Sequence, residues 1–320
     1  MIFGGIPSAG KKERNRVLLG LIAGTIILLS GISPALSGQI IIDGDDQFQF
    51  ARTYMERGEY DRAVSELERF IHFFPKDSQV PLAHHLIGVC YLKGGRYKDA
   101  RKVFSRTLRT YPHSPLAGKA LFLTGESYYD QGLSVEAEYY FGQVLEIHPS
   151  PQLRNAALYR LGWTMMRENR WREASEEFKK VEKGSTFYDR AIELSVESLK
   201  GESLPYKDPV VGGVMAGILP GLGHAYVSRY KDAIVAFLLN GLFIWATVES
   251  FNNDHNVLGG ILAFVEAGWY TGNIYSAVNV AHKWNRKVRN DFRKGLHDRF
   301  DLHFLTSKKG PVGLAVTFRF

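Results

Sequence analysis

The sequence predicts an all-α protein in which a solenoid of about four helix pairs and a capping helix precedes a membrane module of about three helices. Three observations lead to this fold class. Residues 45–187 repeat with a single period, residues 205–283 contain apolar stretches of nearly membrane-spanning length, and basic residues gather at the two ends of the chain. We also expect a β-hairpin at the C-terminus.

The basic charge is confined to short segments. The 320-residue chain has 40 Lys and Arg against 33 Asp and Glu, a net charge of +7. Residues 283–320 contribute +7 and residues 11–16 contribute +3, so the rest of the chain carries about −3. Basic segments beside apolar stretches are typical of membrane proteins. We therefore expect membrane lipid, and no nucleic acid, among the partners.

Residues 1–37 have the organisation of a secretory signal peptide. The basic segment KKERNR precedes an apolar block that begins at Val17, and small residues follow from Ala35 to Ser37. The alternative is an uncleaved N-terminal anchor, and either one would place the following residues outside the cytoplasmic membrane. The single cysteine, Cys90, is far from this exit, so we expect neither a disulfide framework nor a lipid-modified N-terminus. We predict that Cys90 is a small buried residue.

The middle of the chain repeats every 37 residues. One position of each unit holds alanine and another holds a small residue, while two more hold large side chains; a proline closes the first three units. The positions are Ala63, Ala100, Ala137 and Ala174; Ala51, Gly88, Gly125 and Gly162; Tyr54, Tyr91, Tyr128 and Met165; Leu67, Phe104, Phe141 and Phe178; and Pro75, Pro112 and Pro149. Small residues let paired helices approach closely, large ones fill the space between neighbours, and proline ends a helix.

This pattern resembles the tetratricopeptide repeat (TPR), with three extra residues after each proline. It is similar to bacterial envelope TPR proteins, namely the outer-membrane assembly TPR lipoproteins and the Tol–Pal-associated periplasmic TPR protein. The resemblance covers residues 45–187 and implies a periplasmic α-solenoid that holds partner proteins. The chain departs from the lipoprotein members because it lacks their lipid-bearing cysteine. Residues 188–204 are predicted to form the capping helix and linker that close the solenoid.

The resemblance also implies a partner-binding groove along the first helix of each pair. In the later units the corresponding positions are aromatic with charges of both signs, which suits an extended or helical peptide. The alternative is that these aromatic side chains pack against the next unit or the capping helix. The predicted groove residues are Phe48, Arg52, Met55, His85, Val89, Lys93, Phe122, Glu126, Tyr129, Asp130, Tyr159, Trp163, Met166 and Arg167.

Three apolar stretches follow the solenoid, at residues 209–227, 233–248 and 256–282. Each is close to the length of a spanning helix, and a buried soluble bundle is the alternative. With the solenoid outside, three crossings would bring the basic residues 284–320 to the cytoplasm, as the positive-inside rule favours. We therefore expect the cytoplasmic (inner) membrane of a bacterial envelope with a periplasmic solenoid, and the outer membrane is the alternative.

The first apolar stretch carries a short motif. The segment LPGLGHAYVSRYKDAIVAFLL resembles a family of bacterial membrane segments with a Pro-Gly-x-Gly-x-x-Tyr motif. In this chain the motif residues are Pro220, Gly221, Gly223 and Tyr226. Proline and glycine at this spacing predict a broken helix, which a membrane tolerates only where protein or water covers the backbone. Glu266 is the one acid of the third stretch and is therefore a candidate functional residue. The alternative places Glu266 near a membrane interface.

Motifs of known enzymes are missing from the sequence. It contains no HExxH, P-loop, G-x-S-x-G or kinase motif, so we expect no enzyme activity, no metal and no cofactor. Alternating apolar residues from Val312 to Phe320 predict the hairpin in the basic tail. The predicted function is a non-enzymatic, membrane-tethered periplasmic TPR scaffold for protein–protein interaction in bacterial envelope assembly or cell division. The alternative is a transporter- or channel-like membrane module regulated by the TPR domain.

Overall fold

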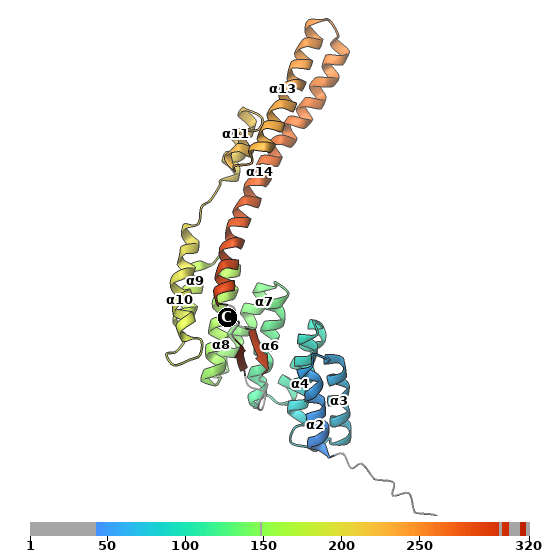
Figure 1. Ribbon diagram of the computed structural model, residues 1–320, viewed down its shortest axis with the longest axis vertical. Coiled ribbons are helices and arrows are strands. Elements are labelled where there is room, and N and C mark those ends of the chain that lie inside the picture. The colour runs from blue at the N-terminus through green and yellow to red at the C-terminus, as the bar shows by residue number, and fades with distance from the viewer. Residues whose placement is uncertain (1–42, 148, 301–302, 307–313, 318–320) are drawn as a thin grey trace, which may run out of the picture. The chain divides into compact units, whose positions relative to one another are not determined.

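The computed structural model describes residues 43–147, 149–300, 303–306 and 314–317. Within these ranges, the chain from Gly44 to Phe300 is helical apart from short connections (Figure 1). The signal peptide or anchor predicted in residues 1–37 lies outside the described residues.

Four helix pairs follow one another, as the repeat predicts. They are α2 (Gly44–Glu56) with α3 (Tyr60–Phe73), α4 (Val80–Lys93) with α5 (Tyr97–Thr110), α6 (Pro115–Asp130) with α7 (Ser134–Glu146), and α8 (Pro151–Arg167) with α9 (Trp171–Lys179). The second helices begin at Tyr60, Tyr97, Ser134 and Trp171, so each starts 37 residues after the last. The helix α10 (Tyr188–Leu199) and the 3-10 helix η1 (Lys200–Ser203) follow α9 and form the predicted cap.

A left-handed residue sets the turn inside each pair. Gly58, Gly95 and Gly132 have φ of 76°, 74° and 77°, and Asn169 has φ of 62° at the same step in the fourth unit. Glycine adopts this conformation without a steric penalty, and asparagine is among the residues that tolerate it best. The turn residues therefore fix where the second helix of each pair begins.

The small positions of the repeat lie where the paired helices cross. A Cβ atom on Gly88, Gly125 or Gly162 would lie within 2.5 to 2.6 Å of a phenylalanine ring from the second helix of the same pair. Close approach of the backbone to these rings explains why glycine fills this position in three units. The repeat alanines Ala63, Ala100, Ala137 and Ala174 are fully buried.

Cys90 is fully buried in the interior of the first two pairs, as predicted. Burial raises the pKa of its thiol to about 12. A thiol held in its protonated form is a poor nucleophile, so Cys90 acts as a small apolar residue of the core.

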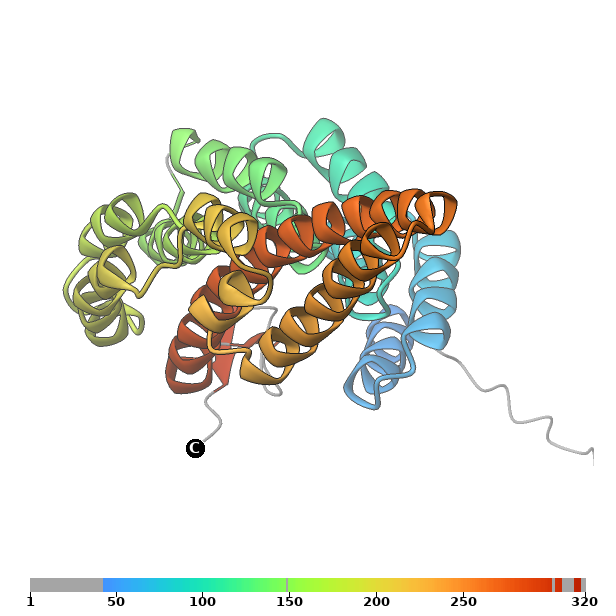
Figure 2. The same cartoon turned by 90° about the horizontal axis from the view of Figure 1, so that it is seen from above.

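The C-terminal module consists of two short helices and two long ones. They are α11 (Pro209–Ile218), α12 (Leu222–Tyr226), α13 (Tyr230–Asn252) and α14 (Asn256–Phe300). The helix α13 and the first half of α14 lie side by side and are joined by a short turn (Figures 1 and 2). In the described part of the chain, α13 is the one helix that is long and apolar enough to cross a bilayer.

The first of the three predicted spans differs from its prediction. With 10 residues, α11 is about 15 Å long, roughly half the thickness of a bilayer core. The helix breaks between Ile218 and Leu222, as the proline and glycines predict. Gly221 has φ of 91°, and a Cβ atom there would collide with the carbonyl of Ala233. The motif thus supplies a turn whose backbone packs directly on α13.

The motif turn is tied to α14 as well. A Cβ atom on Gly223 would collide with the Gly212 carbonyl and approach the Ala277 Cβ atom to 2.6 Å. His224 Nε2 lies 3.1 Å from the Ser276 hydroxyl. The Tyr226 hydroxyl accepts a hydrogen bond from the backbone N–H of Asp208 at 3.1 Å. These contacts hold α11 and α12 against the two long helices.

The predicted basic tail is largely helical. Residues 284–300, expected to lie beyond the last span, continue α14 without a break. Two short strands follow, β1 (His303–Thr306) and β2 (Leu314–Thr317), which pair antiparallel with His303 opposite Thr317. The alternating pattern therefore located the second strand correctly, but the basic helix before it was not predicted.

Candidate functional site

The end of α14 packs against the third and fourth repeats. Leu296 and Phe300 belong to the same buried apolar cluster as Tyr159 and Trp163 of α8. The Tyr159 hydroxyl donates a hydrogen bond to the Phe300 carbonyl at 3.1 Å. Figure 1 shows this end of α14 beside α8. A helix from the far end of the chain thus contacts the first helix of the fourth pair, where the partner-binding groove was predicted.

Aromatic and ionic contacts extend this docking. The ring of His297 meets Trp163 edge-on with centroids 5.8 Å apart, and Phe292 meets Trp171 edge-on at 5.6 Å. Arg299 forms ion pairs with two acids of α10, Glu193 at 3.0 Å and Glu197 at 3.5 Å. We call the surface formed by Tyr159, Trp163 and Trp171 the docking groove. It buries one face of the last turns of α14.

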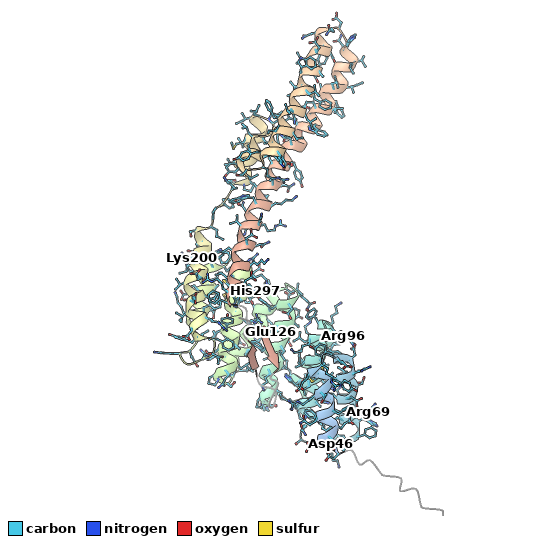
Figure 3. The ribbon with its side chains drawn as sticks, in the orientation of Figure 1. Asp46, Arg69, Arg96, Glu126, Lys200 and His297 are labelled. Atoms are coloured by element: carbon cyan, nitrogen blue, oxygen red, sulfur yellow. The ribbon has the colours of Figure 1, made fainter. Side chains whose placement is uncertain are left out.

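A buried ion pair lies beside the docking groove. Arg160 Nη2 donates to Glu126 Oε2 at 2.8 Å, and Arg160 Nε lies 2.7 Å from Glu126 Oε1. Burial raises the pKa of the Glu126 carboxyl to about 7, against the opposing pull of the Arg160 charge. The Arg160 guanidinium also lies 5.0 Å from the centre of the Tyr129 ring. Figure 3 labels Glu126 and His297, which come from α6 and α14.

A cavity of about 320 Å³ opens between the solenoid and α14. Four of its lining residues come from the solenoid and three from α14: Tyr129, Trp163, Met166 and Arg167, with Arg293, Lys294 and His297. Arg167 donates to the Tyr129 carbonyl, and its guanidinium lies 3.8 Å from the centre of the Tyr129 ring. Arg293 donates to the Arg167 carbonyl. We call this cavity the basic pocket.

The structure brings together the predicted groove residues of the later units. Tyr129, Trp163, Met166 and Arg167 line the basic pocket, and Tyr159 lies under the end of α14. Glu126 is held in its ion pair, and Asp130 is exposed at the end of α6. The partner of this part of the groove in the structure is the chain's own α14. The binding of other proteins by this part of the groove stays a prediction.

Several predicted groove residues lie in the interior instead. Phe48 packs edge-on against Phe70 with centroids 5.2 Å apart, and Phe122 packs against Phe141 at 5.4 Å. Val89 is buried as well. The two phenylalanine side chains fill the space between the two helices of their pair. The predicted residues that are only half-buried are Arg52, Met55 and Lys93 in the first two units and Arg167 in the fourth.

His85 is also an interior residue. Its side chain is 1% exposed, and neither ring nitrogen has a hydrogen-bond partner among the described residues. Burial, and then the charge of Lys119, lowers the pKa of His85 to about 4. The imidazole is therefore neutral at physiological pH and packs 5.8 Å from the Phe104 ring, measured between centroids.

Glu266 lies in the interface between α13 and α14. Gly259, Glu266 and Asn273 are buried at seven-residue intervals on α14, and Gly259 lies against the Phe251 ring of α13. Neither carboxylate oxygen of Glu266 has a hydrogen-bond partner in the described part of the chain. Asn240 of α13, which is buried as well, donates to the Ala236 carbonyl of its own helix. A functional role for Glu266 stays a prediction.

Three apolar residues in the basic tail, which we missed, predict the helix that docks on the solenoid. Phe292, Leu296 and Phe300 recur every four residues within the basic text NDFRKGLHDRF, which is the spacing of one face of a helix. The other missed residues of the site, Arg160 and Arg293, carry no local pattern. Their role depends on which helices the fold brings together.

Repeated helix pairs, small residues at each crossing and a capping helix define a TPR-like α-solenoid. Residues 48–115 and 91–152 match the family model described as "Tetratricopeptide repeat". The chain therefore carries a TPR domain, to which the structure adds the fourth pair, α8 and α9.

Solved structures resemble the chain at low identity. MamA (residues 41 to the end) from Desulfovibrio magneticus RS-1 is 21% identical over 47% of this chain and 77% of its own, with a TM-score of 0.37. A tetratricopeptide repeat protein from Parabacteroides merdae is 12% identical over 79% of this chain and 98% of its own, with a TM-score of 0.40. A Rap protein complexed with Competence and Sporulation Factor is 14% identical over 80% and 65%, with a TM-score of 0.37. No curated protein matches the chain.

Proposed function

We propose that this protein is a membrane-tethered scaffold whose TPR solenoid binds protein partners and whose α13–α14 hairpin anchors it in a bilayer. One observation carries the tether: the two long helices expose large apolar side chains over most of their paired length. These side chains include Val235, Phe237, Leu238, Leu242, Trp245, Val248, Leu258, Ile261, Phe264, Val265 and Trp269. An exposed apolar surface of this extent suits lipid and is poorly suited to water.

The path of α14 supports a hairpin rather than three crossings. Its first half pairs with α13, and its end is bonded to the solenoid through Tyr159 and Arg299. The end of α14 and the solenoid must therefore lie on the same side of the membrane. In this arrangement α13 crosses away from the solenoid and the turn near Asn253 lies on the far side. The first half of α14, which is less apolar than α13, returns paired with it.

Two charge signals oppose each other in this arrangement. The solenoid side of the hairpin is flanked by basic residues, namely Arg229, Lys231 and Lys283, whereas the turn that follows Glu249 has no Lys or Arg. The positive-inside rule applied to these residues alone would favour a cytoplasmic solenoid. The N-terminal segment favours export. We place the solenoid in the periplasm, because the first apolar segment to insert usually sets the orientation.

A periplasmic solenoid leaves a defined surface for partners. The end of α14 covers the docking groove, so the first two repeats offer the concave surface that remains, with Met55 and Lys93 half-buried along it. We propose proteins of envelope assembly or cell division as the partners, as the resemblance to envelope TPR proteins implies.

The tether is tested by labelling single cysteines in a Cys90→Ala background. Ser203→Cys, Asn253→Cys and Lys287→Cys report the end of the solenoid, the hairpin turn and the basic part of α14. In intact spheroplasts, a membrane-impermeant maleimide is expected to label positions 203 and 287 and to leave position 253 unlabelled until the membrane is permeabilised. Labelling of 203 and 287 from opposite sides would refute the hairpin. Labelling of 253 alone would keep the hairpin and reverse the orientation.

Partner binding is tested by photo-crosslinking in cells. A benzophenone amino acid replaces Lys93 on the concave side, and a matched control replaces the exposed Lys102 of α5. We expect discrete crosslinked protein bands at position 93 that are at least tenfold weaker at position 102. Equal or no crosslinking at the two positions would count against a scaffold that uses this surface.

A further inference from the structure

We propose that the basic pocket is a binding site for a carboxylate group of an acidic peptide segment, with an apolar neighbour of that carboxylate packed on the aromatic wall. The inference rests on the proposed scaffold function and names the chemistry of one contact. The site exists only because α14 returns to the solenoid, since three of its seven lining residues come from that helix.

The walls of the pocket differ in character. Arg167, Arg293 and Lys294 form a cationic wall, whereas Tyr129, Trp163 and Met166 form an apolar one. Trp163 and Met166 are buried at the base, and Lys294 is exposed at the rim. A volume of about 320 Å³ is at the small end of ligand pockets in general. It is large enough for one or two side chains and too small for a folded partner.

The positive charge of the pocket is not balanced. Arg167 and Arg293 each donate to a backbone carbonyl, and no carboxylate pairs with either one among the described residues. Asp130 acts on Arg167 and Glu168 acts on Arg293 through their charges, without an ion pair. Glu126 also acts on Arg167 through its charge, but its carboxylate is held in the ion pair with Arg160 and does not contact Arg167 or Arg293.

The environment of Arg293 shows the same imbalance. Its pKa is lowered first by burial and then by the positive charges of Arg167 and Arg289. A half-buried guanidinium beside two others is electrostatically unfavourable, and an anion between Arg167 and Arg293 would relieve that repulsion.

The geometry of guanidinium groups selects the ligand. Arg167 donates to one carbonyl, and Arg293 donates to one carbonyl and to Asn290 Oδ1, so each guanidinium keeps further N–H donors. A guanidinium binds carboxylate or phosphate with two parallel hydrogen bonds. Phosphate shares this chemistry. The aromatic wall favours the carboxylate of a peptide, because a Phe, Leu or Met side chain next to an acid would pack on Trp163 and Met166.

The test uses the full chain in detergent micelles with 5-fluorotryptophan, in which Trp163→Phe assigns the Trp163 resonance. The probe is acetyl-Phe-Glu-amide, and the matched control is acetyl-Phe-Gln-amide, which has the same shape without the charge. We expect the acidic probe to shift the Trp163 resonance in a saturable way and to bind at least tenfold more tightly than the control. Arg293→Gln should weaken it at least tenfold, whereas Arg286→Gln, an equal charge change on an exposed part of α14, should leave it unchanged.

Three outcomes would overturn the proposal. These are equal binding of the two probes, unchanged binding in Arg293→Gln, and a saturable shift with inorganic phosphate that the acidic probe does not produce. Repeating the Lys93 crosslinking in the Arg293→Gln protein separates this inference from the scaffold function. If crosslinks persist while no probe binds, the pocket proposal fails and the scaffold stands.

Discussion

Replacing Arg160 with alanine is expected to lower the free energy of unfolding by about 3–5 kcal/mol at pH 7.5. The Glu126 carboxylate accepts a hydrogen bond from Arg160 Nη2 and lies 2.7 Å from Arg160 Nε, and its side chain is only 8% exposed. Without Arg160, folding at this pH would either bury an unpaired negative charge or require Glu126 to take up a proton, and both cost free energy. Urea denaturation of the full chain, followed by far-UV circular dichroism, measures the loss.

The loss should depend on pH in a direction set by Glu126. Burial already raises its pKa to about 7, and removal of the Arg160 charge would raise the pKa further. An acid with a raised folded-state pKa destabilises the protein progressively as the pH rises from the unfolded-state value towards the folded-state one. The Arg160→Ala protein should therefore be least impaired near pH 5, where Glu126 binds a proton, and most impaired above pH 7.

Two variants serve as controls for Arg160→Ala. Arg172→Ala removes an arginine whose pairing with Glu202 is exposed, and it should cost less than about 1 kcal/mol. Glu126→Gln combined with Arg160→Met removes both charges and should recover most of the lost stability. A loss below about 1 kcal/mol in Arg160→Ala, or a loss equal at pH 5 and pH 7.5, would contradict the account of a buried charge.

The solenoid was predictable because its determinants are local and repeated. Each unit has the same residue types at the same positions: glycine or asparagine at the turn, alanine at the helix crossing and a large side chain between the helices. The three repeat glycines lie within contact distance of Phe104, Phe141 and Phe178, which are the residues that the pattern pairs with them. A requirement that recurs four times at one spacing can be read from a single sequence.

The candidate site was only partly predictable, because it joins segments more than a hundred residues apart. The pattern of α8 located Tyr159, Trp163, Met166 and Arg167, but nothing in it indicates what covers them. The covering segment was interpreted by its charge, as a tail attracted to the cytoplasm. Apolar side chains such as Phe292 decide where this segment lies in the fold, because burying apolar surface contributes more free energy than the placement of exposed basic side chains.

The misplaced groove residues have a related cause. The register of the repeat says which positions face the neighbouring helix, but one helical position can contact either the partner helix or the open groove. Phe48, Val89 and Phe122 are apolar and pack inside, whereas Arg167 occupies the same helical surface and points into the pocket. Polarity alone does not separate the two sets, because His85 lies in the interior while Trp163 and Met166 line the pocket.

The combined variant Leu296→Ala and Phe300→Ala is expected to release the end of α14 from the docking groove. Both side chains are almost fully buried in the cluster that includes Trp163. Each truncation on its own removes about 2–5 kcal/mol from a packed core. Because the two side chains share one cluster, their effects do not simply add, and the total cannot exceed the free energy that holds the segment in place. We expect a loss of at least about 4 kcal/mol.

Limited trypsin digestion measures this release, because the segment is rich in lysine and arginine and is cleaved only when it opens. A loss of about 4 kcal/mol corresponds to about a thousandfold faster cleavage between residues 283 and 299, as long as reclosing outpaces cleavage. Asp298→Ala, an exposed change on the same turns, should leave the rate unchanged. If the double variant were cleaved no faster than this control, Leu296 and Phe300 would not hold α14 to the solenoid. Because the hairpin topology and the basic pocket both depend on that contact, the argument for each would then fall with it.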